Sequence, residues 1–330
     1  MCNPHFFQDR NLRSCSVVGL QLKAFVGVTD FDWFTYLSGL PEIDEVNFWQ
    51  PGGRQHFRTL SLGEPFLFKL HSPRDFIVGG GFFAHSTVLP VSLTWDVFGE
   101  KNGASSFEEM RRLIEKHRRI DSSSSEDYQI GCILLEQPFF LRERDWIQVP
   151  SDWKPNIVQG KSYDTTAGIG KKLWEDVQLR LQARKDLWKE ARLADIEGGY
   201  GPPQIVMPRL GQGSFRVLVT DVYQRRCSVT QERTLPALDA VHIKPFGKSG
   251  PHSVNNGILF RSDIHKLFDT GYVTISKDCH FEVSKRIKEE FENGRDYYAM
   301  HGRLLRLPPE KSLHPGSEFV AWHNENVFRG

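Results

Sequence analysis

The chain has 330 residues, of which 39% are hydrophobic and 25% are charged, a composition typical of a globular protein. Because one hydrophobic core rarely organises so many residues, this length predicts two domains. The 42 Lys and Arg residues nearly balance the 41 Asp and Glu residues, and a net charge of +1 excludes a uniformly basic nucleic-acid-binding protein. Any DNA-binding surface must therefore come from local clusters of Lys and Arg.

Alternating apolar residues over 20–28 predict a strand, and the spacing in Asp30–Leu40 predicts a helix with Asp30 as its N-cap. Three short apolar segments bounded by Gly, Pro and polar turns predict further strands. The segment before Trp95 is interpreted as a loop because it contains Pro90. The additional predicted elements are strands at Phe76–Phe83 and Ile130–Phe140, a strand candidate at Phe57–Leu70 that Gly63 and Pro65 break into a loop and a strand, an amphipathic helix at Phe107–His117 and a solvated loop at Ser122–Ser125.

The longest helical pattern, Gly168–Ala194, is followed by a segment dense in Gly and Pro at 198–208. Such a segment predicts a domain boundary. We therefore predict an N-terminal domain at 1–185, a helical linker at 186–214 and a C-terminal domain at 215–330. The expected fold class is α+β, with a β-rich first domain flanked by helices and a compact second domain. Residues 215–226 fit a helix and a strand equally well.

The cysteines are dispersed, and no two of them form a CxxC pair. This pattern favours a reducing compartment and argues against a disulfide framework or a four-cysteine zinc site. The first 19 residues include charged positions and no long apolar stretch, so we expect neither a signal peptide nor a membrane span. The expected location is the cytoplasm, without a membrane partner.

The C-terminal domain contains His and Asn residues in a characteristic order. His242 stands in an apolar segment, Asn256 precedes Gly and an apolar pair, and His265 begins a His-x-x-Phe-Asp-x-Gly stretch. This pattern resembles the HNH nuclease family over about the last third of the chain. The resemblance implies a ββα-metal fold, in which the three residues lie on a hairpin strand, the following loop or strand, and a short helix.

The resemblance also implies metal-dependent hydrolysis of phosphodiester bonds in DNA. A neutral His accepts a proton from water near pH 7, and one divalent cation stabilises the charge that develops on the phosphate. By this resemblance His242 is the general base and His265 is a metal ligand. Asn256 either holds the loop that carries the base or orients the base by a hydrogen bond.

The expected metal ligands depart from the family pattern at one position. Many HNH enzymes carry an Asp or His immediately before the base, whereas here Val241 cannot bind a metal. Asp239 is the nearest carboxylate and the expected second ligand, with Asp263 and Asp269 as alternatives. Oxygen and nitrogen ligands favour Mg²⁺ or Mn²⁺, with Ni²⁺ or Co²⁺ as substitutes. No structural zinc is expected, because Cys227 has no CxxC partner.

The N-terminal domain carries aromatic residues in an order that resembles the EVE, YTH and PUA-like β-barrel superfamily. A tryptophan-bearing loop at 46–51 is followed by Gly63 and Glu64 before an apolar strand, then by a glycine-rich strand and Trp95. In that superfamily, aromatic rings hold a modified base that has been flipped from its strand. An SRA-like reader, which is also β-rich and flips bases, is the alternative.

We expect Trp49 and Trp95, with Phe48 as a third ring, to line a modified-base pocket, because an extruded base exchanges stacking on its neighbours for stacking on protein rings. The alternative is that these rings fill the core, since the chain has 24 Phe and 8 Trp. The remaining tryptophans and histidines of interest are assigned to ordinary packing and hydrogen bonding: Trp33, Trp146, Trp153, His252, His280, His301 and His314. The residues expected to bind DNA are Arg54, Arg58 and Lys69 in the first domain, and Lys244 and Arg261 in the second.

These features together predict a modification-dependent, type IV-like restriction endonuclease. It would recognise 5-methylcytosine or 5-hydroxymethylcytosine in double-stranded DNA by base flipping and cut with a single-metal HNH site. One such site cuts one strand, so a homodimer is expected. Two alternatives are an HNH nuclease that needs no modified base and a non-catalytic protein that binds DNA.

Overall fold

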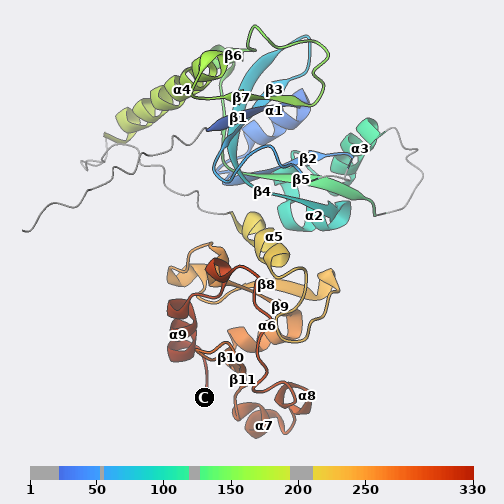
Figure 1. Cartoon of the computed structure of the whole chain (residues 1–330), viewed down its shortest axis with the longest axis vertical. Coiled ribbons are helices and arrows are strands. Elements are labelled where there is room, and N and C mark those ends of the chain that lie inside the picture. Colours follow the sequence, from blue (N-terminus) through green and yellow to red (C-terminus); the bar gives the residue numbers. More distant parts are fainter. Residues whose placement is uncertain (1–21, 53–55, 119–126, 194–210) are drawn as a thin grey trace, which may run out of the picture.

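The computed structural model describes residues 22–52, 56–118, 127–193 and 211–330 (Figure 1). The expected loop at Ser122–Ser125, the expected boundary at 198–208 and Arg54 lie outside these ranges. In the described residues no helix is both long enough and apolar enough to cross a membrane.

The N-terminal domain is built on one mixed, seven-stranded sheet. Strands β1 and β3 are parallel, and the other pairs are antiparallel. The hydrogen-bonded order is β2 (Glu45–Gln50), β5 (Gln129–Phe140), β4 (Phe76–Pro90), β3 (Pro65–Leu70), β1 (Lys23–Thr29) and β7 (Gly160–Asp164), and β6 (Ile147–Gln148) pairs with the start of β4.

The sheet curves because β4 is long and irregular. Its register against β5 shifts twice, between Gly80 and Phe82 and between Phe83 and His85, and such bulges bend a strand. The curvature brings β2 across from β3, so that the Phe48 and Phe66 ring centroids lie 4.8 Å apart. The result is a barrel-like sheet that encloses an aromatic core.

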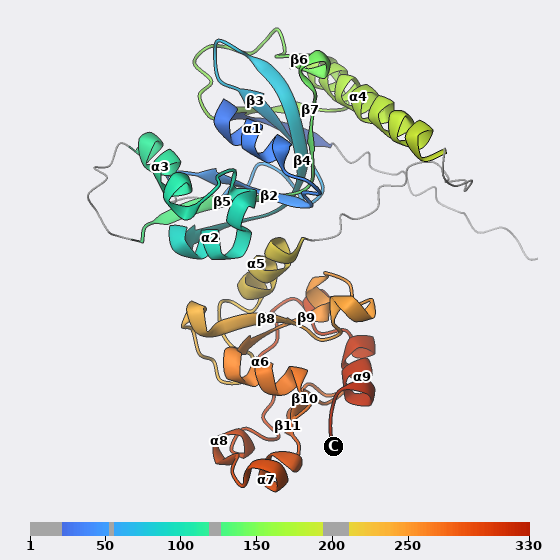
Figure 2. The same ribbon diagram turned by 180° about the vertical axis from the view of Figure 1, so that it is seen from behind.

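Helices cover the remaining faces of this sheet (Figure 2). α1 buries Trp33, Phe34 and Leu37 in the aromatic core, while α2 and α3 cover a second apolar cluster on β4 and β5. α4 packs Leu173 and Val177 against the cluster beside β7. The helices are α1 (Phe31–Gly39), α2 (Val91–Phe98), η1 (Gly99–Asn102), α3 (Phe107–Arg118), η2 (Glu143–Asp145) and α4 (Gly168–Leu193).

The C-terminal domain is centred on a ββα unit formed by β8, β9 and α6. The antiparallel pair places His242 opposite Gly257, and α5 packs so closely on it that a Cβ at Gly257 would lie 2.4 Å from Val219 Cγ2. The elements are α5 (Gln212–Val222), η3 (Leu235–Ala237), β8 (Leu238–His242), η4 (Phe246–Lys248), η5 (Val254–Asn256), β9 (Gly257–Arg261), α6 (Ser262–Asp269), β10 (Val273–Ile275), β11 (Phe281–Val283), α7 (Arg286–Phe291), α8 (Arg295–Tyr298), η6 (Lys311–Leu313) and α9 (Ser317–Asn326).

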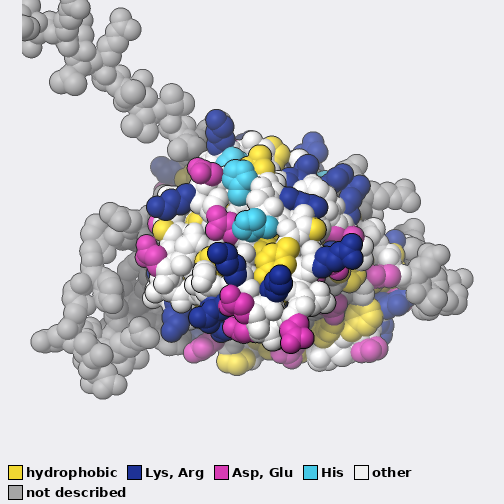
Figure 3. All heavy atoms as spheres, turned by 90° about the horizontal axis from the view of Figure 1, so that it is seen from below, with side chains coloured by type: hydrophobic (Ala, Val, Ile, Leu, Met, Phe, Trp, Pro, Cys, Tyr) yellow, Lys and Arg dark blue, Asp and Glu magenta, His cyan; other side chains and the backbone are white. Residues whose placement is uncertain are grey.

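Helix α5 lies between the two domains in both views (Figures 1 and 2). Phe215 and Val219 belong to the core of the C-terminal domain, whereas Val217 packs into the cluster beneath α2 and α3. Seen from the end that carries α7 and α8, the surface intersperses Lys and Arg with Asp and Glu (Figure 3).

The predicted α+β class and the β-rich first domain with flanking helices are confirmed. Two local predictions are wrong. The segment before Trp95 is helix α2, because Pro90 stands at its N-cap and Val91, Thr94 and Phe98 are buried at helical spacing. The expected tryptophan loop is strand β2, paired along its whole length with β5.

Candidate nuclease centre and base-binding pocket

His242 ends strand β8, and its ring lies flat on Phe215 of α5. The ring centroids are 3.8 Å apart and the planes differ by 10°. His242 Nε2 shares a 2.9 Å hydrogen bond with Nδ1 of His252, a contact that the sequence interpretation had missed. Burial, and secondly the neighbouring His252, lower the pKa of His242 to about 4. The ring is therefore neutral at pH 7.

Asn256 closes the loop between the two hairpin strands. Its side-chain oxygen accepts a hydrogen bond from the Lys244 N–H, and its amide group donates to the carbonyl oxygens of Lys244 and Pro251, all at 2.9 Å. The side chain is fully buried. These contacts fit the loop-holding role, which is one of the two roles expected for this residue, and the loop that it closes also carries His252.

Asp239 and His265 come together from β8 and α6. His265 Nδ1 lies 3.0 Å from Asp239 Oδ2, and its other ring nitrogen lies 3.1 Å from Asp269 Oδ2, one helical turn further along α6. Hydrogen bonds to Asp269 and then Asp239 raise the pKa of His265, because two carboxylates stabilise the imidazolium. His242 lies at the other end of β8 and has a separate set of contacts.

The Asp239 and His265 pair suits a small divalent cation. It offers an imidazole nitrogen and a carboxylate oxygen, which are 3.0 Å apart and hydrogen-bonded to each other, and both atom types bind divalent cations. Within the described ranges no three His, Cys, Asp or Glu side chains gather as a ready metal site. A site of this kind relies on water and phosphate for its remaining ligands, as Mg²⁺ sites commonly do.

The predicted DNA-binding residues differ in availability. The prediction that Lys69 binds DNA is wrong. Lys69 is only 3% exposed, pairs with Asp75 and lies over the Trp153 ring, so it cannot reach a phosphate. Arg261 donates two hydrogen bonds to Asp263, from Nε at 2.6 Å and from Nη2 at 2.7 Å, so these two nitrogens are already engaged. Two described candidates remain. The Lys244 ammonium lies 5.7 Å from the centre of the Trp322 ring, and the Arg58 side chain is exposed.

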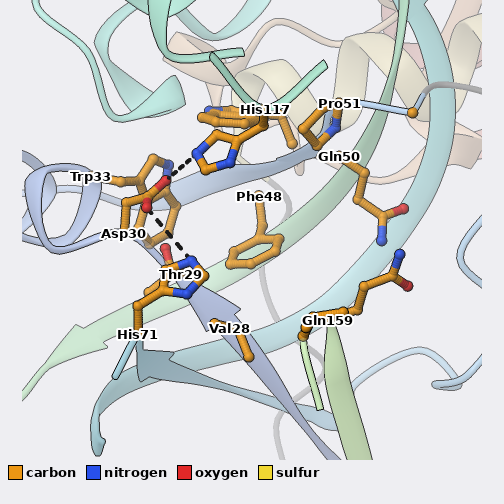
Figure 4. Close-up of a pocket in the computed structure, with 13 residues that line it drawn as sticks. Val28, Thr29, Asp30, Trp33, Phe48, Gln50, Pro51, His71, His117 and Gln159 are labelled. Atoms are coloured by element: carbon orange, nitrogen blue, oxygen red, sulfur yellow. Dashed lines mark hydrogen bonds and ion pairs between the residues drawn. The ribbon is translucent and has the colours of Figure 1, made fainter. Parts of the chain in front are cut away.

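A cavity of about 390 Å³ opens between the ends of β1 and β2, the two strands that curvature brings face to face (Figure 4). Phe48 and Trp49 line it, together with Trp33, which the sequence had assigned to packing. Trp95 lies outside it, on α2 beside Phe107. The structure thus brings together two of the three expected aromatic residues.

Asp30 stands at the polar side of this cavity. Its carboxylate lies 2.9 Å from His117 Nε2 and 3.6 Å from His71 Nε2, and Figure 4 shows both rings turned toward it. Asp30 is at the N-cap of α1, as expected, but its side chain makes no capping hydrogen bond. Gln50, the last residue of β2, and Gln159, just before β7, also line the cavity (Figure 4).

Residues 227–276 match the family model described as HNH endonuclease, which confirms the predicted nuclease domain. No curated protein sequence matches the chain. A mutant of ZmASCH from Zymomonas mobilis is 11% identical over 46% of this chain and 96% of its own, with a TM-score of 0.32. The modification-dependent TagI restriction endonuclease is 12% identical over 91% of this chain and 81% of its own, with a TM-score of 0.28.

The lowered pKa of His242 makes stability depend on pH. As pH falls from about 6.5 toward about 4, the unfolded chain takes up a proton at this position while the folded chain does not. The free energy of unfolding should therefore decrease over this window. Urea unfolding at pH 7 and pH 5 measures the decrease, which should be smaller in His242→Gln. An equal decrease in both proteins would contradict the assignment.

Removing the Asn256 side chain should destabilise the C-terminal domain. Asn256→Ala removes three hydrogen bonds of a fully buried side chain and leaves partly buried backbone groups of Lys244 and Pro251 without these partners, at a cost of about 1–3 kcal/mol. Asn255→Ala is the matched control, because that side chain is only partly buried. Thermal or urea unfolding compares the two variants, and equal stability would refute the role given to Asn256.

Proposed function

We propose that this chain, whose C-terminal part is an HNH endonuclease domain, is a modification-dependent restriction endonuclease that binds a modified cytosine in the cavity of its N-terminal domain. The observation that supports this most directly is the aromatic cavity with Asp30 at its polar side, in the same chain as a nuclease centre with a neutral His242. The cavity volume lies in the usual range of small-molecule sites.

The cavity has the chemistry to accept cytosine. Phe48 presents its ring to the interior, where it can stack on an extruded base (Figure 4). The Asp30 carboxylate accepts hydrogen bonds, which suits the exocyclic amine of cytosine and disfavours the carbonyl oxygen that thymine carries at the same position. Val28 and Pro51 add apolar surface suited to a methyl or hydroxymethyl group.

In the nuclease domain, His242 takes a proton from water as the water oxygen bonds to phosphorus and the bond to the 3′ oxygen breaks. Asp239 and His265 would hold the divalent cation, Mg²⁺ or Mn²⁺, which supplies charge stabilisation at the phosphate when bound. Asn256 keeps the loop in place through backbone contacts. Because each chain carries one such centre, a double-strand cut would need two copies, and we propose a homodimer on modified double-stranded DNA.

Cleavage of matched plasmids tests the whole proposal. Plasmids with cytosine, 5-methylcytosine or 5-hydroxymethylcytosine are incubated with Mg²⁺ or Mn²⁺, and wild type is compared with His242→Ala. We expect cutting of modified DNA, reduced at least about a hundredfold by the substitution because the general base is lost. Equal cutting of all plasmids would leave a nuclease without a modified-base reader. Failure to cut any plasmid with either metal would leave a non-catalytic DNA-binding protein.

Substitution of Asp30 tests the reader separately from the cut. Asp30→Ala removes the acceptor from the cavity, so affinity for modified DNA should fall about tenfold to a hundredfold. Asp32→Ala is the control, because Asp32 lies on the same helix and is exposed outside the cavity. Fluorescence anisotropy with a short duplex carrying one modified cytosine measures both. Equal affinity of the two variants for modified DNA would show that Asp30 does not contact the base.

A further inference from the structure

Glu45, at the start of β2, is a buried carboxylate whose main partners belong to the other domain. It is 1% exposed, and its two oxygens accept hydrogen bonds from the N–H groups of Gly213 and Ser214, both at 2.8 Å. These N–H groups lie in the first turn of α5, where helix N–H groups have no partner within the helix. The third partner is Lys101, whose Nζ donates a hydrogen bond to Glu45 Oε1 at 3.0 Å.

The local sequence is adapted to this contact. α5 begins with Gly211-Gln212-Gly213, and both glycines touch the Glu45 side chain. A Cβ at Gly211 would lie 2.3 Å from Glu45 Cδ, and a Cβ at Gly213 would lie 2.9 Å from Oε1 and 2.7 Å from the Phe98 ring. All three distances are shorter than real Cβ contacts, so the first domain can approach α5 this closely only because both positions lack a side chain.

The negative charge at this junction belongs to Glu45. Glu136 stands directly opposite on β5, is fully buried and has no hydrogen-bond partner among the described residues. Burial, and secondly the charge of Glu45, raise the pKa of Glu136 to about 8, so Glu136 is mainly protonated at pH 7. A charged Glu45 beside a neutral Glu136 is the arrangement that favours attraction to the positive end of the α5 dipole.

Helix α5 carries this contact to the nuclease centre. Phe215 follows Gly213 and Ser214 within the same turn, and its buried ring is the surface on which His242 lies at 3.8 Å. In the other direction, β2 continues from Glu45 to Phe48 and Trp49, which line the cavity. One strand and one helical turn therefore join the cavity wall to the face of the general base.

We propose that Glu45 is a positioning residue for the nuclease: by holding the first turn of α5, it fixes Phe215 and thereby the ring of His242. The N-terminal domain then completes the catalytic centre of the C-terminal domain as well as reading the DNA. The inference rests on the proposed function for the role of His242, and the contacts among Glu45, α5 and His242 stand without it.

The experiment compares the full chain with Glu45→Ala, Glu45→Gln and Asp44→Ala. Asp44 is the matched control, because it is the preceding residue and also pairs with Lys101, whereas the hydrogen bonds to the first turn of α5 come to Glu45. The single-turnover cleavage rate at saturating modified DNA should fall about tenfold to a hundredfold in Glu45→Ala, since small displacements of a catalytic group cost this much. The cleavage rate of Glu45→Gln, which keeps one acceptor oxygen, should lie between those of wild type and Glu45→Ala.

Two further readouts separate positioning from loss of fold or of DNA binding. The affinity for modified DNA should be unchanged in every variant, so that the effect appears in the rate alone. A second variant, Phe215→Leu, keeps an apolar side chain and removes the stacked ring, and it should reproduce the loss of rate. Equal rates in Glu45→Ala and Asp44→Ala, or a loss confined to DNA affinity, would overturn the inference.

The His242 ring signals in NMR spectra distinguish failure of this inference from failure of the proposed function. They report the Phe215 contact even in a chain that cuts no DNA, because a stacked aromatic ring shifts them. Glu45→Ala should move these signals and Asp44→Ala should leave them in place. If wild type cuts no DNA but the signals behave in this way, the nuclease proposal fails and the contact stands. Signals that do not move would refute the positioning role.

Discussion

The hydrogen bonds between the Glu45 carboxylate and the first turn of α5 are the interaction on which the arrangement of the two halves depends. A buried carboxylate without such partners would pay a large desolvation cost, and an uncapped helix start buried in an interface would leave its N–H groups unsatisfied. The carboxylate therefore satisfies the free N–H groups of the helix, and these N–H groups offset the cost of burying the carboxylate. The same turn of α5 then presents Phe215 to His242, so the interface and the nuclease centre share one support.

The nuclease centre combines two histidines in opposite electrostatic settings. His242 is half-buried on an aromatic ring and beside a second histidine, which keeps it neutral. His265 lies between two carboxylates, which favours a positive charge at that position, whether from a proton or from a metal ion. The hairpin and α6 keep these settings apart, which suits the separate roles of general base and metal ligand that we propose for the two residues.

The cavity of the first domain arises from the curvature of its sheet. Bulges in β4 bend the sheet until β1 and β2, which do not pair with each other, face across an opening. The end of β1 then contributes Asp30, and the end of β2 contributes Phe48 and Trp49. His71 and His117 reach the same carboxylate from two other parts of the chain. The pocket is therefore a product of strand order and bending.

The sequence by itself determined the nuclease domain, because His242, Asn256 and His265 lie within one short segment in an order that resembles the HNH family, and a family model matches the same segment. Apolar periodicity also located β1, β3, β4, β5, α1, α3 and α4. It missed α2, where Pro90 resembled a loop signal, and β2, where the sequence predicted a loop. The tertiary structure alone decided that His252 contacts His242, that Asp30 faces a cavity and that Lys69 is buried. These contacts join residues through loops, barrel closure and a domain interface, and no local pattern records which side chains such long-range packing brings together.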